Sequence, residues 1–274
     1  SLFLEPLSTV DINNDIVATE QDEQDEVRRI LRTLANHLRA RALDVRTTLA
    51  AATDVDIVQA RARFSLLIQG VEPLLSTDTR IEFLSARHPL MIPAVLARLE
   101  PQRKNSDGTT QTPNDVRLVP PTGALIITGP NTGGKTVALK TVGLLALMAQ
   151  AGLHVPAGPG STTTVFRTIF SDIGDEQSIT ANLSTFSAHI ANIALVERHL
   201  KLPALLLLDE IGAGTDPVEG GALGTAVIDH FRKRGALVVV TTHNDALKSY
   251  ALTTPGVTCA GFGFDPETYA PSYR

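Results

Sequence analysis

Cysteine is nearly absent from this chain, which contains only Cys259. A single cysteine excludes an internal disulfide framework and a cysteine-rich metal site, so we expect Cys259 to be a small buried side chain. Long apolar runs are lacking too, because the run 144–149 stops at Gln150 and is too short to cross a membrane. The first residues show no basic patch followed by an apolar core, so they do not resemble a signal peptide. Together these absences predict a cytoplasmic protein with no membrane partner.

An excess of positive charge is also missing. The net charge is −5, whereas a free-standing nucleic-acid module is usually basic. Local patches matter more than the total, so nucleic-acid binding is neither argued nor excluded by composition. With 43% apolar and 19% charged residues, the chain has the composition of an ordinary globular protein.

The segment Gly129–Thr136, with the sequence G-P-N-T-G-G-K-T, is the most informative motif. It lies between the apolar stretch 124–128 and a helical pattern that starts at Lys135. Its glycines let successive N–H groups and the helix N-terminus point at an anion. Lys135 is predicted to reach the β- and γ-phosphates, and the Thr136 hydroxyl to bind Mg²⁺. The predicted nucleotide site comprises Gly129, Pro130, Asn131, Thr132, Gly133, Gly134, Lys135, Thr136 and Val137.

Two acids follow a second apolar strand. The four leucines 205–208 suit a strand that is covered on both faces, and Asp209 and Glu210 come directly after them. Asp209 can hold Mg²⁺ through water opposite Thr136, and Glu210 can orient or deprotonate an attacking water. The alternative, an acidic pair that only starts a capped helix, is disfavoured by the phosphate loop in the same chain.

Two further residues extend the candidate site. His243 follows the strand 236–241, the next strand after the acids, where a histidine can sense a γ-phosphate through a hydrogen bond. Ser184 precedes a helix face of Phe186, Ile190 and Ile193, which predicts that it is the N-cap of that helix. A capped helix start can also bind phosphate, but spacing alone favours the plain cap.

The first 80 residues are predicted to be helical after an extended entry over residues 1–12. Steps of three and four residues mark one helix face, formed by Val27, Leu31, Leu34, Leu38, Ala42, Val45 and Leu49. A second helix is predicted from Asp54 to a stop at Gly70, packed against the first as an antiparallel pair. Their charges indicate either two solvated faces or a lever that carries motion away from an ATPase.

Residues 81–274 contain a polar loop at 101–118, which we expect to be mobile. An α/β pattern follows this loop. Short apolar strands alternate with helices, which predicts a sheet that is mainly parallel in its core. The predicted elements are 124–128, 135–150, 164–170, 184–200, 204–208, 220–233 and 236–241.

Taken together, the motifs resemble the MutS family of ATPases, and within it the bacterial endonuclease MutS type-two branch. The resemblance covers essentially the whole chain. It is carried by Ile127–Thr136, Gly152–Ala157, Asp172–Ser178, Leu183–Phe186 and Leu208–Pro217. The features specific to the branch are Thr132–Gly134 and Ala213–Gly220.

The resemblance implies an ABC-type ATPase domain over 81–274 joined to a helical lever over 1–80, with ATP or ADP and Mg²⁺ as cofactors. ABC-type sites are composite, so Ser184 would reach the γ-phosphate bound by a partner subunit in a homodimer. Asp209 and Thr136 would serve Mg²⁺, and Glu210 the attacking water. His243 would be the γ-phosphate switch.

A further expectation concerns the base. His88, in the turn Arg87–His88–Pro89, either stacks on the adenine or belongs to a purely structural turn.

By the same resemblance, the function is ATP binding and hydrolysis in a protein that acts on branched or recombining DNA through nucleotide-gated dimer clamping. Two alternatives are an ATPase that splits collided ribosomes, with RNA or rRNA as partner, and a non-catalytic nucleotide-dependent scaffold. A metabolic kinase would leave Leu183–Phe186 without a role. The branch's core, clamp, dimer-forming helices and Smr nuclease domain are not expected among these residues, so nuclease activity is expected only of a longer protein.

Overall fold

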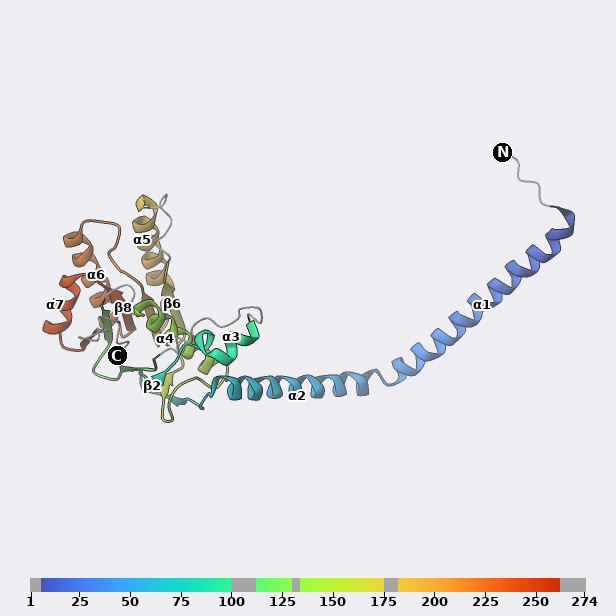
Figure 1. Cartoon of the computed structure of the whole chain (residues 1–274), viewed down its shortest axis with the longest axis horizontal. Helices are drawn as coiled ribbons and strands as arrows, with labels where there is room; N and C mark the ends of the chain where they lie inside the picture. The colour runs from blue at the N-terminus through green and yellow to red at the C-terminus, as the bar shows by residue number, and fades with distance from the viewer. Residues whose placement is uncertain (1–5, 100–111, 130–133, 175–181, 262–274) are drawn as a thin grey trace. The chain divides into compact units, whose positions relative to one another are not determined.

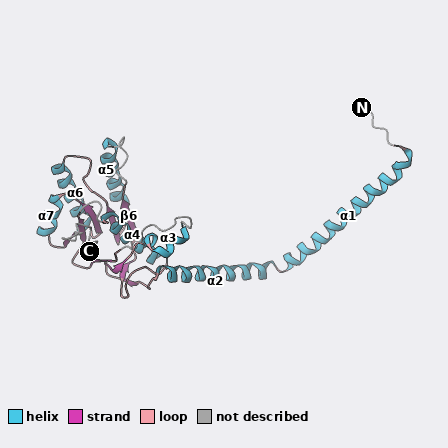
Figure 2. Ribbon diagram, in the orientation of Figure 1, coloured by secondary structure: helices cyan, strands magenta, loops and turns pink. Residues whose placement is uncertain are grey.

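The computed structural model describes residues 6–99, 112–129, 134–174 and 182–261 (Figure 1). The chain divides into two compact units, residues 1–60 and 61–274. All strands among the described residues belong to the second unit (Figure 2). The functional boundary expected between residues 80 and 81 stays a prediction. Within the described ranges, no helix combines the length and the apolar character needed to cross a membrane.

Two long helices open the chain, α1 (Leu7–Ala40) and α2 (Ala42–Ile68). The expected extended entry is wrong from Leu7 onward, and the first helix ends at Ala40 rather than near residue 50. Apolar spacing runs on through Ala42 and Val45, so periodicity could not detect this break. Leu38 and Leu49 are more than half exposed, so the antiparallel pairing of the helices stays a prediction.

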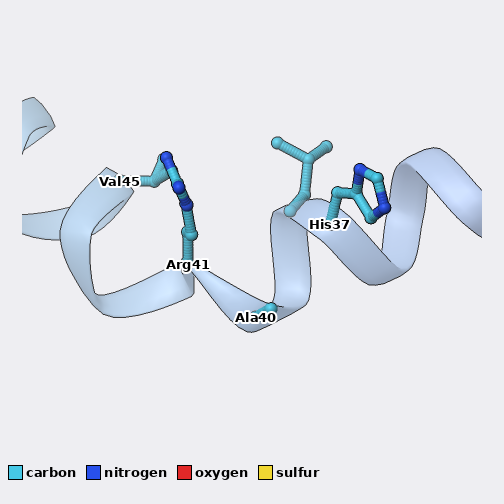
Figure 3. A pocket seen from close by; sticks show the side chains of 5 residues that line it. His37, Ala40, Arg41 and Val45 are labelled. Carbon is cyan, nitrogen blue, oxygen red and sulfur yellow. The ribbon is translucent and has the colours of Figure 1, made fainter.

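The break itself forms a shallow hollow (Figure 3). Side chains from the end of α1 and the start of α2 line it: His37, Leu38, Ala40, Arg41 and Val45. Arg41 is the C-cap of α1, and its backbone N–H donates to carbonyls of the preceding turn. The hollow has walls only from these two helices, which keep their side chains largely exposed.

The last turn of α2 belongs to the second unit and is held there by several contacts. Gln69 takes a left-handed conformation with φ 51°, and the Gly70 N–H donates to Ser65 O at 2.8 Å, which ends the helix. The Arg87 guanidinium donates to Ile68 O at 3.0 Å and to Gln69 Oε1 at 3.1 Å. A cation at the negative end of a helix is stabilising, so Arg87 holds the C-terminal turn of α2 in place within the second unit.

The core of the second unit is a five-stranded parallel sheet, which confirms the predicted α/β class. Its strands, in spatial order, are β6 (Thr168–Asp172), β7 (Ala204–Leu208), β8 (Leu237–Thr242), β4 (Ala124–Thr128) and β9 (Val257–Gly261). Every residue of β4, β7 and β8 is buried, as expected for strands covered on both faces.

The helices bury these strands from two sides. Leu205 and Leu207 of β7 pack in one cluster with α4 (Lys135–Gln150), and Leu206 and Leu208 pack in a second cluster. The second cluster includes residues of α5 (Asn182–His199), α6 (Pro217–Lys233) and α7 (Asp245–Thr253). Because successive strand side chains point to opposite faces, the four leucines supply both clusters.

A smaller mixed sheet adjoins this core, with the order β1-β5-β2-β3. Its strands are β1 (Leu74–Ser76), β5 (Thr162–Thr164), β2 (Ile81–Ala86) and β3 (Asn114–Leu118), and β2 leads into the short helices η1 (Pro89–Met91) and α3 (Pro93–Leu99). The single strand predicted over 164–170 is therefore two strands, β5 and β6, in different sheets.

Two sequence-based expectations are corrected here. The polar loop was expected to reach residue 118, but residues 114–118 form β3, which pairs with β2 and buries Val116 and Leu118. Residues 100–111 of that loop lie outside the described residues. Cys259 is exposed rather than buried. It lies on β9, which pairs only with β4 among the described residues, and Val257 is the one buried residue of that strand.

Candidate nucleotide site

The ends of three neighbouring strands form the candidate site. The phosphate loop follows β4, Asp209 and Glu210 follow β7, and His243 follows β8. Parallel strands present their carboxyl ends at one edge of the sheet, where ligands of such folds bind. Gly129 and Gly134 take φ values of 131° and 86°, and Gly134 is the N-cap of α4. Pro130, Asn131, Thr132 and Gly133 lie outside the described residues.

Lys135 and Thr136 open α4 and point toward the acids. The Lys135 side chain is 2% exposed; its Nζ donates to Gly129 O at 2.8 Å and lies 3.0 Å from Glu210 Oε1. These two contacts satisfy an ammonium that would be expensive to bury alone. Thr136 Oγ1 donates to Asp209 Oδ1 at 3.3 Å. The half-buried Val137 follows in the same turn.

Asp209 is buried at the end of β7 and held from three directions. Its Oδ1 accepts from Thr136 and from the Thr241 hydroxyl, and its backbone N–H donates to Asp172 O at 2.9 Å. A carboxylate oxygen beside a threonine hydroxyl fits Mg²⁺, which prefers hard oxygen ligands and completes its shell with water and phosphate oxygens. Sequence reasoning missed Thr241, although a threonine near the end of the adjoining strand was the available signal.

Glu210 joins the two sides of the site. One carboxylate oxygen lies 3.0 Å from Lys135 Nζ, and the other lies 2.6 Å from His243 Nδ1. The Glu210 side chain is 15% exposed, whereas that of His243 is 69% exposed, so water reaches this side of the carboxylate. Glu210 has φ 48°, a left-handed conformation that costs about 1–2 kcal/mol in a non-glycine residue. Such strain persists where the surroundings fix the residue, here with its N–H bonded to Thr241 Oγ1 at 3.0 Å.

The loop after Glu210 is tightly built. Gly212 has φ 84°, and a Cβ added there would lie 2.3 Å from Gly220 O. Asp216 caps α6, because its Oδ1 accepts from the N–H groups of Val218 at 2.9 Å and Glu219 at 3.3 Å. The loop and the start of α7 line one cleft, whose residues lie within 210–218 and 242–246. Glu210 and His243 therefore border this cleft.

Two further predicted site residues are His88 and Ser184. His88 is half-buried at the start of η1. Burial lowers the pKa of its imidazole, and the charge of Lys140 on α4 lowers it further. A neutral imidazole of this kind can stack on a base, so its adenine contact stays a prediction. Ser184 lies in the first turn of α5, which begins at Asn182, so its predicted N-cap role is wrong. The helix starts two residues earlier than its apolar face indicates, and the Ser184 side chain is not described.

Sequence reasoning also missed a polar cluster between β6 and α5. Asp172 ends β6, and its Oδ2 lies 2.5 Å from His189 Nδ1. Its other oxygen accepts from Asn192 Nδ2 at 3.0 Å. His189 and Asn192 are three residues apart on α5 and therefore share a face. Their spacing was visible in the sequence, but nothing there indicated that β6 would present a carboxylate to them.

Comparison with known proteins adds two findings. The family model for MutS domain V matches residues 125–266. The chain is 45% identical to the Endonuclease MutS2 of Symbiobacterium thermophilum, and 43% identical to those of Alkaliphilus metalliredigens and Geobacillus thermodenitrificans. Each match covers all of this chain but 32% or 33% of the relative, so the chain spans about a third of their length.

Proposed function

Because the chain belongs to the MutS family, as a MutS2-type ATPase module, we propose that it binds ATP with Mg²⁺ and hydrolyses it at the edge formed by β4, β7 and β8. The observation that carries the proposal is the position of Glu210. Its carboxylate lies between Lys135 and His243, one residue after Asp209. If Lys135 contacts the β- and γ-phosphates, Glu210 lies next to the γ-phosphate, which is the position that a general base for the attacking water requires.

Each residue has a distinct task in this proposal. Backbone N–H groups of the phosphate loop and the start of α4 bind the triphosphate. Lys135 neutralises the β- and γ-phosphate oxygens, and Thr136 and Asp209 orient Mg²⁺, which supplies charge neutralisation when bound. Glu210 holds the attacking water and accepts its proton, and His243 holds the far side of that carboxylate. Positioning and charge together account for phosphoryl transfer without a covalent intermediate.

We further propose that two copies complete the site, with the first turn of α5 of one copy reaching the nucleotide of the other. ATP would clamp the copies together, and hydrolysis would release them. The helices α1 and α2 would transmit this change. The relatives carry the name endonuclease, so branched or recombining DNA is the proposed substrate of the whole protein, with nuclease chemistry outside these residues. The proposed location is the cytoplasm.

Glu210→Gln tests the hydrolytic step, since it keeps the shape and one hydrogen-bond acceptor but removes the base. We expect the ATP turnover of the whole protein to fall by about a hundredfold or more, as is typical for the loss of a general base, while ATP still binds. Glu72→Gln is the matched control, because Glu72 is exposed and outside the site. Equal turnover in both variants would remove Glu210 from the mechanism and favour the non-catalytic scaffold.

The substrate is tested separately. We expect the whole protein in the ATP state to retain four-way DNA junctions in a pull-down more strongly than ribosomes. Retention of ribosomes alone would contradict the DNA assignment and favour the ribosome-splitting alternative.

A further inference from the structure

The cluster of Asp172, His189 and Asn192 has no task in the scheme above. Asp172 is mostly buried, with a side chain that is 13% exposed, and His189 is 23% exposed. With one donor from α5 on each oxygen, both oxygens of the Asp172 carboxylate are bonded to that helix. The cluster therefore joins β6 and α5, two elements that are separated in sequence by residues 173–181.

The same carboxylate-bearing residue also touches the catalytic edge through its backbone. Asp172 O accepts the N–H of Asp209, at 2.9 Å, just where β6 and β7 end. Asp172 is thus bonded to α5 through its side chain and to the magnesium-holding residue through its main chain. Within the part of the chain that the structure describes, no other residue makes both connections.

The cluster lies close enough to the start of α5 to fix the position of its first turn. His189 lies five residues after Ser184, about 7.5 Å along the helix axis at 1.5 Å per residue. At its other end, α5 is tied to α6, since Glu197 pairs with His230 at 2.9 Å and with Arg234. These outer contacts are exposed, and among the α5 side chains that the structure describes, from His189 onward, the pairing with Asp172 is the mostly buried one nearest to the first turn.

We propose that His189 is a positioning residue for ATP hydrolysis, which fixes the first turn of α5 relative to Asp209 through Asp172. The inference rests on the proposed function, in which this turn reaches the nucleotide held by a second copy. Nucleotide binding within one copy is proposed to use the phosphate loop, Lys135 and Thr136, and the side-chain bonds of the cluster described above run between Asp172, His189 and Asn192 rather than to Lys135 or Thr136. Loosening α5 therefore lowers the rate of the assembled site and leaves the affinity of a single copy unchanged.

Two variants separate positioning from simple stability. His189→Ala removes the bond to Asp172, whereas His189→Asn keeps a donor in the position of Nδ1. We expect His189→Ala to reduce kcat by about ten- to a hundredfold, the loss typical of a site displaced by about an ångström. We expect the Kd for Mg·ATP to change less than about twofold, because His189 bonds to Asp172 and not to Lys135 or Thr136. His189→Asn should recover most of kcat.

His199→Ala is the matched control, because His199 lies on the same helix and bonds to Leu195 O at 2.9 Å within it. Its turnover should equal that of the unaltered protein. The double variant Asp172→Ala/His189→Ala should lose no more than the more impaired single variant, as residues that act as one unit do.

The measurements are steady-state ATP turnover of the whole protein, calorimetric Kd for Mg·ATP, and the thermal unfolding midpoint. Normal turnover in His189→Ala would overturn the inference. So would equal losses of kcat, affinity and unfolding midpoint in both His189 variants, since these would indicate a purely structural tie. No turnover in the unaltered protein would instead contradict the proposed function, and the inference with it.

Discussion

Replacing Gly212 by alanine should disturb the loop that follows Asp209 and Glu210 more than the small size of the added methyl group suggests. The residue has φ 84°, and an added Cβ would lie 2.3 Å from the carbonyl oxygen of Gly220 and 2.7 Å from its carbonyl carbon. These are backbone atoms at the start of α6, so no side chain can swing away to relieve the contact. The loop or the helix must move.

The expected loss has two parts. A left-handed backbone in a residue with a Cβ costs about 1–2 kcal/mol, and forcing an extra carbon into a packed contact adds about 1–3 kcal/mol. Gly212→Ala should therefore lower the free energy of unfolding of the second unit by about 2–5 kcal/mol, the sum of these terms.

The chain contains variants that isolate each part. Gly160 also has a positive φ, 87°, but nothing lies within 4 Å of an added Cβ, so Gly160→Ala carries the backbone term alone. Gly220→Ala carries the steric term alone, with its Cβ 2.2 Å from Gly212 O. That term is offset by about 0.5–1 kcal/mol, because alanine is the better helix former.

Urea unfolding followed by circular dichroism measures all three variants. We expect Gly212→Ala to be the least stable, and less stable than Gly160→Ala by about 1–3 kcal/mol. We also expect its ATP turnover to fall, because the moved loop begins two residues after Glu210. Equal unfolding free energies for Gly212→Ala and Gly160→Ala would refute the close packing of the loop on α6.

Three further outcomes are expected. Asp216→Ala removes the cap of α6 and should lower the unfolding free energy by about 1 kcal/mol, whereas Asp216→Asn should retain most of it, as measured by urea unfolding. His88 has a pKa below that of an unfolded histidine, about 6.5, so the unfolded state binds its proton first and stability falls as the pH drops below that value. His88→Gln should lose less stability than the unaltered chain between pH 7 and pH 5 in thermal unfolding, and an identical pH profile would contradict this. Arg87→Ala should lower the unfolding free energy by about 1.5–3 kcal/mol by removing charged hydrogen bonds to the end of α2, and full recovery in Arg87→Lys would contradict the two-point contact.

The sequence was sufficient to place the candidate site residues at one edge of the sheet. Motif spacing placed Lys135, Thr136, Asp209, Glu210 and His243 after successive strands, and parallel strands deliver their carboxyl ends to one edge. The structure brings all five together, with Glu210 between Lys135 and His243. A linear motif does not show which residue of a neighbouring strand will bond to its side chains. Thr241, the partner of Asp209, lies outside the motifs and was therefore overlooked.

The long-range pairings were beyond sequence reasoning. The strand Asn114–Leu118 has a single alternation of polar and apolar residues, and its identity depends on pairing with β2 some thirty residues earlier. The break at Arg41 falls inside an unbroken apolar period, so only backbone geometry reveals it. The contact between Asp172 on β6 and His189 on α5 was likewise not predictable, because no local pattern brings these two residues together. Local patterns determine elements, whereas tertiary pairing determines which of them meet.

The central claim is that β4, β7 and β8 hold a magnesium nucleotide at their carboxyl ends. Isothermal titration calorimetry of the folded chain with Mg·ATP, alongside Lys135→Ala, tests it most directly. We predict uptake of one nucleotide per chain, weakened by about tenfold or more in Lys135→Ala through the loss of a charged hydrogen bond. Binding of equal strength in the variant, or no heat of binding in the folded unaltered chain, would contradict the account.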